Sequence, residues 1–285
     1  RRSPKSQINL LFRFIQYIER QVVLFDAIED AAFPIVNNMD GIGTLRSLKE
    51  TASSENKLEL LKKYLEEFKV RIVLTAHPTQ FYPGSVLGII TDLTEAIKEN
   101  DLTRIHQLLA QLGKTPFFKH KKPTPYDEAV SLIWYLENVF YKSFGTVYDY
   151  IQQNIFEGEH IQNDIINIGF WPGGDRDGNP FVTPEITLKV ASRLRETIIK
   201  NYYRDLRQLK RKVSFAGVED RVTELEGEMY KMTTNKKTYL TLDHLVSELK
   251  EIKAEIIQKH QSLYAPEVNS LLNKIHLFGF HFSSL

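Results

Sequence analysis

Two short polar segments hold the residues that could do chemistry, and each comes at the end of an apolar run. The first is Thr75-Ala76-His77-Pro78-Thr79-Gln80, at the end of the run 70–76. An imidazole exchanges protons near neutral pH, and a histidine at a strand end is held by a rigid element. The hydroxyls of Thr75 and Thr79 are placed to orient the His77 ring. The alternative is a buried histidine that bonds backbone carbonyls.

The second segment is Gly173 to Pro180, which reads Gly-Gly-Asp-Arg-Asp-Gly-Asn-Pro and follows the run 165–171. Glycines such as Gly173 and Gly174 permit positive φ and close backbone approach, so amide groups can converge on an anion. The Arg176 guanidinium offers a planar fork to phosphate or carboxylate. The alternative is a tight turn stabilised by its own side chains. The polar residues that would support either structure are Asp175, Asp177 and Asn179.

Two familiar ion sites do not fit this loop. Counted from Asp175, a calcium loop needs Gly at its sixth position and Glu at its twelfth, where Pro180 and Ile186 stand. A phosphate-binding P-loop needs Lys followed by Ser or Thr, where Asn179-Pro180 follows the last glycine. The histidines also lack the His-Glu-x-x-His spacing. The calcium loop, the P-loop and the His-Glu-x-x-His site are therefore excluded.

Composition narrows the class of protein further. The 37 Lys and Arg nearly balance 36 Asp and Glu, so no strong field attracts nucleic acid or anionic lipid. The absence of cysteine excludes disulfides and thiolate catalysis and favours a cytoplasmic location. No segment approaches the ~20 apolar residues of a membrane span. The first residue is not Met, so we expect the numbering to begin inside a longer chain.

Helical periodicity, with apolar residues at steps of three and four, dominates the sequence. It predicts helices over about 11–33, 61–68, 86–97, 124–151, 184–212, 219–232, 242–260 and 266–274. Three other apolar runs have strand length: 70–76, 165–171 and 275–282. Because long helical stretches separate these runs, we expect parallel pairing in an open α/β sheet or a barrel. Sites in both architectures gather at the carboxyl ends of strands.

Three motifs, taken in order along the chain, resemble phosphoenolpyruvate carboxylase. They are Thr75 to Gln80, Lys122 to Ala129, and Gly173 to Thr183. The closing segment 276–282 also resembles that family's next strand. The resemblance implies a mainly α protein with a few short parallel strands, which form a partial TIM-like α/β barrel surrounded by many helices. It implies a helical segment over residues 1–68 and the first part of the barrel domain over 69–285, truncated at its carboxyl end.

The resemblance also implies an activity. Members of the family are lyases that form oxaloacetate and phosphate from phosphoenolpyruvate and bicarbonate, an anaplerotic fixation of carbon dioxide that feeds the tricarboxylic acid cycle. His77 would take the proton from carboxyphosphate, and Gly173, Gly174 and Arg176 would hold anions. The family uses Mg²⁺, whose ligands are expected outside this chain. A homotetramer in the cytoplasm is implied, without nucleic acid or membrane partners, and the chain alone is expected to be inactive.

One departure from the family pattern leaves a second function open. Phe81-Tyr82-Pro83-Gly84-Ser85 stands where the family has an arginine pair. The alternative is therefore a non-catalytic anion-binding or regulatory module derived from that family. A third possibility, a helical scaffold for protein partners, predicts that His77 and Arg176 lie apart in separate packing environments.

Overall fold

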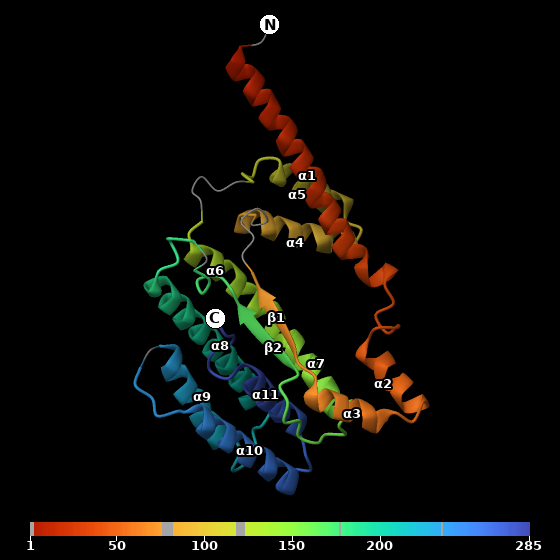
Figure 1. Cartoon of the computed structure of the whole chain (residues 1–285), viewed down its shortest axis with the longest axis vertical. Helices are drawn as coiled ribbons and strands as arrows, with labels where there is room; N and C mark the ends of the chain where they lie inside the picture. Colours follow the sequence, from red (N-terminus) through yellow and green to blue (C-terminus); the bar gives the residue numbers. More distant parts are fainter. Residues whose placement is uncertain (1–2, 76–81, 118–122, 177, 235) are drawn as a thin grey trace. The chain divides into compact units, whose positions relative to one another are not determined.

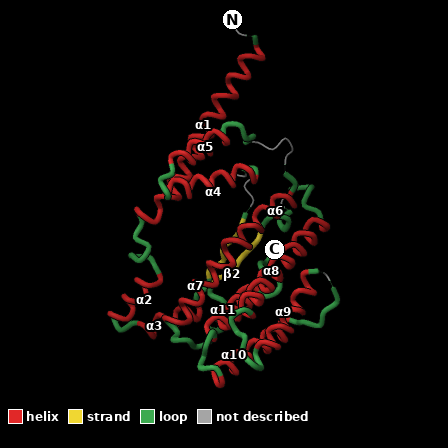
Figure 2. The backbone as a smooth tube through the Cα atoms, turned by 180° about the vertical axis from the view of Figure 1, so that it is seen from behind, coloured by secondary structure: helices red, strands yellow, loops and turns green. Residues whose placement is uncertain are grey.

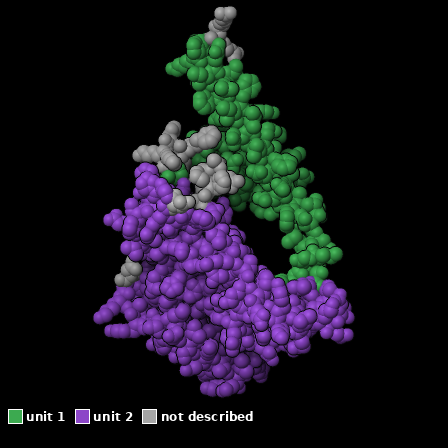
Figure 3. All heavy atoms as spheres, in the orientation of Figure 1, with its two compact units in different colours: residues 1–47, 77–123 green, residues 48–76, 124–285 purple. Residues whose placement is uncertain are grey.

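The structure is a computed structural model that describes residues 3–75, 82–117, 123–176, 178–234 and 236–285. The chain forms two compact units, which Figure 3 draws in different colours. One unit contains residues 1–47 and 77–123, and the other contains residues 48–76 and 124–285. Figure 2 shows how much of the described chain is helical, with the two short strands in yellow.

The first unit packs helices α1 (Pro4–Val36), α4 (Gly84–Lys98) and α5 (Leu102–Leu112) against one another. Ser3 caps α1 by accepting a hydrogen bond from the Ser6 amide, and Pro4 takes the first helical position. The helix ends shortly after Pro34, as the sequence predicts. The shared core of this unit consists of Val23, Ala27, Val86, Ile89, Leu93, Ala96, Leu108, Leu112 and Phe117.

The second unit contains a parallel sheet of β1 (Val70–Leu74) and β2 (Ile166–Phe170), which confirms the first two predicted strands. Val70 pairs with Ile166, and Leu74 pairs with Phe170. Helix α3 (Leu58–Glu67) precedes β1, and further helices of the unit pack on one another (Figure 1). These are α6 (Pro125–Tyr135), α7 (Tyr141–Asn154), α8 (Pro184–Lys210), α9 (Glu219–Thr233), α10 (Leu242–Lys259) and α11 (Ala265–Phe278). Helix α2 (Leu45–Ser54) contains the boundary between the units.

The helix predicted over 124–151 is present, with one local change. Thr124 accepts a hydrogen bond from the Asp127 amide at 3.2 Å, and the Asp127 carboxylate accepts one from the Thr124 amide at 2.9 Å. This reciprocal cap starts α6. Between α6 and α7 the chain makes a π-helical turn, η2 (Leu136–Phe140), so the stretch continues without a break but with wider winding.

The prediction of a third strand over 275–282 is wrong. The apolar residues Leu271, Ile275 and Phe278 lie at helical steps and are buried, so α11 continues to Phe278 and ends at Gly279, which has φ +51°. The extended contact comes later, where Ser284 forms a parallel bridge with Gly169. A short apolar run is compatible with a strand or with a buried helix, and here the run continues the helix because its apolar face packs in the core.

The bridge at Ser284 also fixes an order across the sheet. The Phe170 amide donates to the Ser284 carbonyl at 2.8 Å, whereas the next amide, that of Trp171, donates to the Leu74 carbonyl at 2.9 Å. Successive amides of a strand point to opposite edges, so β2 lies between β1 and Ser284. Over the described residues the sheet consists of two parallel strands and this bridge, and no closed barrel is present.

No helix in the described part of the chain has the length and apolar character that crossing a membrane requires.

Candidate functional site

Both motif segments leave the sheet at the same end, which is the carboxyl end of its two strands. Because β1 and β2 are parallel and in register, their carboxyl ends coincide (Figure 1). The hydrogen bond from the Trp171 amide to the Leu74 carbonyl extends this pairing to the residue after each strand. Thr75 follows β1 directly and is exposed. His77 and Thr79 lie outside the described residues, so their roles stay predictions.

The side chain of Asn163 sets the opposite ends of the two strands side by side. Its buried amide nitrogen donates to the carbonyls of Leu65 and Phe68, at 2.9 and 2.6 Å, just before β1. The Tyr148 hydroxyl bonds the carbonyl of Asn163 itself at 3.2 Å, just before β2. The Asn163 nitrogen is satisfied in this way, although the buried Asn163 side-chain oxygen has no hydrogen-bond partner among the described residues, and two such bonds fix a geometry. The register that brings the motifs together therefore has a polar anchor.

The glycine-rich loop makes much of its hydrogen bonding within itself. The amides of Gly174 and Asp175 both donate to the Trp171 carbonyl, at 3.0 and 3.1 Å. The Asn179 side chain accepts from the Phe181 amide at 3.1 Å, and its own amide donates to the Arg176 carbonyl at 3.3 Å. Such bonds are those of a tight turn. The amides of Gly174 and Asp175 therefore do not converge on an external anion in this conformation.

Close packing against α8 explains why the loop begins with glycine. Gly173 is buried and has φ +78°, a backbone conformation that side chains disfavour. A Cβ atom at Gly173 would lie 2.6 Å from Cγ2 of Val190, and the Gly173 carbonyl accepts a hydrogen bond from the Thr187 hydroxyl at 2.7 Å. A Cβ at Gly174 would lie 3.3 Å from Cβ of Leu285. The loop is thus held between α8 and the end of the described chain.

The charged residues of the loop are arranged around its outer side. Arg176 is exposed, Asp175 is half-buried, and Asp177 lies outside the described residues. An exposed guanidinium beside a strand end can contact an anion without the cost of burying an isolated charge. The structure thus brings Thr75, Gly173 and Gly174 to the carboxyl end of the sheet.

One charged residue near the candidate site, Arg71, was not predicted from the sequence. Arg71 lies on β1 on the same face as Val73, and its guanidinium donates to the Ser284 hydroxyl across Gly169. The absence of a side chain at Gly169 makes room for it, since a Cβ there would lie 3.4 Å from Nε of Arg71. The run 70–76 is mostly apolar, yet the residues of β1 are exposed or half-buried. The alternation Val70-Arg71-Ile72 was the signal that one face carries a charge.

The described residues contain no group of three or more His, Cys, Asp or Glu side chains that could hold a metal ion. The residues present therefore do not fit a Mg²⁺ site, and no step of chemistry is assigned to a metal here.

Comparison with known proteins identifies the family. The sequence model for phosphoenolpyruvate carboxylase matches residues 30–232. A phosphoenolpyruvate carboxylase of Shewanella loihica is 31% identical over 217 residues, which cover 67% of this chain and 24% of that protein. Another from Aliivibrio salmonicida is 27% identical over 265 residues, covering 84% of this chain and 30% of that protein. The chain spans about a quarter of the length of these curated relatives. The chain belongs to the phosphoenolpyruvate carboxylase family.

Proposed function

We propose that this chain forms part of an enzyme that makes oxaloacetate and phosphate from phosphoenolpyruvate and bicarbonate. The observation that carries this proposal is that the carboxyl ends of β1 and β2 lie side by side, where the Trp171 amide bonds the Leu74 carbonyl. The motif containing His77 and the glycine-rich loop both leave the sheet there. Carboxyl ends of parallel strands are where α/β proteins bind ligands and do chemistry. Membership of the family supports the choice of reaction.

In this proposal His77 is the catalytic residue. Its imidazole takes the proton from carboxyphosphate, and the resulting imidazolium stabilises the departing phosphate. Thr75 and Thr79 orient the ring. Arg176 supplies the cationic fork for the substrate anions, while Gly173 and Gly174 shape the loop that carries it. The internal hydrogen bonds of the loop support a positioning role for its amides and leave anion contact to Arg176. Asp175, Asp177 and Asn179 support the loop.

We also propose that β1, β2 and the extended segment at Ser284 are the first three strands of a TIM-like barrel. The order across the sheet, with β2 in the middle, agrees with consecutive parallel strands. The exposed face carrying Arg71 and Val73 would then face the barrel interior. The barrel domain would comprise residues 69–285 together with further chain, preceded by a helical segment over 1–68.

The remaining components belong to the longer protein. Its activity would require Mg²⁺ held outside this chain, and the acting form would be a cytoplasmic homotetramer with no nucleic acid or membrane partner. The 285-residue chain alone would be inactive.

The test is an assay that couples oxaloacetate formation to NADH oxidation by malate dehydrogenase. It compares His77→Ala with the unchanged protein, both extended to the full length of the relatives, with Mg²⁺ and bicarbonate present. Loss of general acid–base catalysis typically costs 10²–10⁴-fold in rate, so we expect a fall in kcat of at least about a hundredfold. His106→Ala is the matched control, because His106 is exposed on α5, and it should keep full activity.

Two results would contradict the proposal. A well-folded, full-length protein without activity would rule out the enzyme and favour the anion-binding module. Activity that survives His77→Ala would leave the reaction standing but remove His77 from its catalytic role. Circular dichroism of each variant separates both results from simple unfolding.

A further inference from the structure

A cavity of about 640 Å³ lies between α10, α11, the last turn of α7 and the segment that follows α7. Helices α10 and α11 lie side by side there (Figure 1). Its apolar wall includes Val246, Ile257 and Leu272. The polar groups that line it are mainly cationic or amide side chains, namely His160, Lys250, Lys253, Asn269, Asn273 and His276. A cavity that combines apolar walls with a few convergent polar groups is the usual form of a small-molecule site.

Lys253 is the residue that points to a ligand. Its half-buried ammonium donates to the Asn269 side-chain oxygen at 2.6 Å. Within the described parts of the chain no carboxylate lies within 4.0 Å of it. Burial lowers the pKa of Lys253, because its charged form is poorly solvated. A partly desolvated cation with only a neutral partner is an incompletely compensated charge.

The position of Lys253 is fixed by a chain of amides. Asn269 donates from its side-chain nitrogen to the Gln152 oxygen at 2.6 Å, which directs the Asn269 oxygen at Lys253. Asn273 donates to the same Gln152 oxygen at 2.6 Å and to Asp149 at 2.7 Å. Gln152 and Asn273 are buried. The ammonium is therefore held in place at the cavity wall, since its supporting groups have few other arrangements.

A second group of basic side chains lines the same cavity. The rings of His160 and His276 lie 5.9 Å apart, and Nε2 of His276 is 3.2 Å from the Asp164 carboxylate. Burial lowers the pKa of His276, the Asp164 charge opposes this, and His160 and Lys250 add to the lowering. Among the described residues that line the cavity, Asp243 is the one acidic side chain. The two lysines, Lys250 and Lys253, therefore outnumber the carboxylates in this lining.

We propose that this cavity binds a small organic dianion, with Lys253 and Lys250 contacting its charged groups and the apolar wall contacting its carbon skeleton. The chemistry shared by candidate ligands is two negative charges on a short apolar body, and either carboxylates or a phosphate can provide the charge. This cavity is separate from the candidate site at the carboxyl ends of β1 and β2, and the proposed binding does not depend on the proposed carboxylase activity.

The test is isothermal titration calorimetry of the 285-residue chain with succinate and, separately, inorganic phosphate at constant ionic strength. We expect saturable binding, with succinate tighter than phosphate because only succinate can bury carbon against the wall. A charge-assisted hydrogen bond contributes about 1.5–3 kcal/mol, so Lys253→Met should weaken binding by about tenfold or more. Lys259→Met is the matched control on α10, since Lys259 pairs with Glu255 outside the cavity, and it should bind as the unchanged chain does.

A second variant makes the test independent of any folding defect. Asn269→Asp would supply Lys253 with an internal carboxylate, so it should abolish binding. Because it also removes the N–H that bonds Gln152, circular dichroism checks that the helices are retained. Affinity should also be higher at pH 6 than at pH 8, because the bound dianion favours protonation of His276. The proposal fails if no saturable heat is seen, or if Lys253→Met and Asn269→Asp bind as tightly as Lys259→Met.

Discussion

At the scale of single residues, buried phenols tie three helices of the second unit together. The Tyr202 hydroxyl of α8 donates to the Gly279 carbonyl at 2.7 Å, just after α11. The Tyr141 hydroxyl of α7 donates to the Asp205 carboxylate at 2.8 Å, and the Lys274 ammonium donates to the same carboxylate oxygen at 2.7 Å. Burial, aided by the Asp205 charge, raises the pKa of both phenols well above the usual value of 10.0.

These raised pKa values predict how stability depends on alkaline pH. Because the pKa is higher in the folded than in the unfolded state, the stabilisation is complete below about pH 10 and is lost as pH rises above it. Tyr202→Phe removes one such group. The free energy of unfolding should then fall less steeply above pH 10, by about 1.4 kcal/mol per pH unit. At pH 7 the lost hydrogen bond should cost about 1 kcal/mol.

Urea unfolding between pH 9 and pH 11 measures both effects. Tyr239→Phe is the control, because Tyr239 is 83% exposed and should leave the slope unchanged. If Tyr202→Phe gave a curve parallel to that of the unchanged chain, the Tyr202 phenol would not be the source of the alkaline slope.

Gly173 offers a test of the loop that carries Arg176. Gly173→Ala would add a strained positive φ and a contact at 2.6 Å with Val190, at a combined cost of about 2–4 kcal/mol. Gly178→Ala is the matched control, because Gly178 also has positive φ, at +68°, but has no atom within 4 Å of the added Cβ. It should lose only the conformational part, about 1–2 kcal/mol. Chemical denaturation gives both values.

The contact with Val190 can be isolated by a further change. Adding Val190→Ala to Gly173→Ala should recover part of the loss relative to the two single variants. Simple additivity of the two single variants would show that the contact itself contributes nothing.

At the scale of elements, strong periodicity and capping signals were enough to find most helices. Thr124 and Thr183 start helices where the sequence predicts them, because a threonine followed by proline is a specific signal. The segments α2 and α5 were missed, and the run 275–282 was assigned to a strand instead of α11. What decided that case was burial against Tyr141 and Phe144, whose rings pack on Phe278. Those partners lie over a hundred residues away and are invisible to a local pattern.

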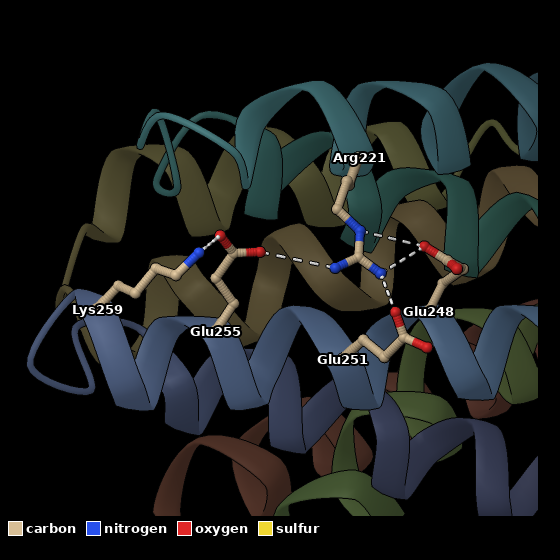
Figure 4. A network of polar contacts seen from close by, with 5 residues as sticks. All are labelled: Arg221, Glu248, Glu251, Glu255 and Lys259. Atoms are coloured by element: carbon tan, nitrogen blue, oxygen red, sulfur yellow. Dashed lines mark hydrogen bonds and ion pairs between the residues drawn. The ribbon is translucent and has the colours of Figure 1, made fainter.

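One arginine of α9 contacts three carboxylates of α10 (Figure 4). The Arg221 guanidinium contacts Glu248 at 2.8 Å, Glu251 at 2.7 Å and Glu255 at 3.6 Å, all on α10. Arg221→Met keeps the length of the side chain but leaves three neighbouring carboxylates without their shared cation. Since partly exposed pairs are weak individually, we expect a loss of about 1 kcal/mol.

Salt should distinguish this loss from a packing effect. The difference between Arg221→Met and the unchanged chain should shrink in 1 M NaCl, because screening weakens both the attraction and the repulsion. Arg46→Met, which removes an exposed pair with Asp40, is the control and should change the melting temperature little. A loss that is the same at both salt concentrations would indicate that the Arg221 stem, not its charge, stabilises the contact.

At the scale of the whole molecule, the motifs could be identified from the sequence, but their position next to each other in the fold could not. Thr75 and the glycine-rich loop lie at the same end of the sheet because β1 and β2 pair in register. Asn163 stabilises this register through hydrogen bonds to residues almost a hundred positions away. Arg71 lies beside the site because Gly169, which pairs with Val73, leaves room for its side chain. Local patterns specify elements, whereas the pairing of distant strands decides which side chains meet.

One helix, α1, also exposes large apolar side chains along one face. Leu11, Phe14, Ile18 and Phe25 on α1 lie at steps of three, four and seven, and each is between 58% and 66% exposed. Contiguous apolar faces of this kind promote association. The 285-residue chain should therefore self-associate as its concentration rises, and the double variant Phe14→Glu with Ile18→Glu should shift it toward monomer in sedimentation velocity. The charge-matched control, Gln16→Glu with Gln21→Glu, changes exposed polar positions of the same helix and should associate as the unchanged chain does. Equal dissociation of the two double variants would mean that added charge, not loss of the apolar face, separates the copies.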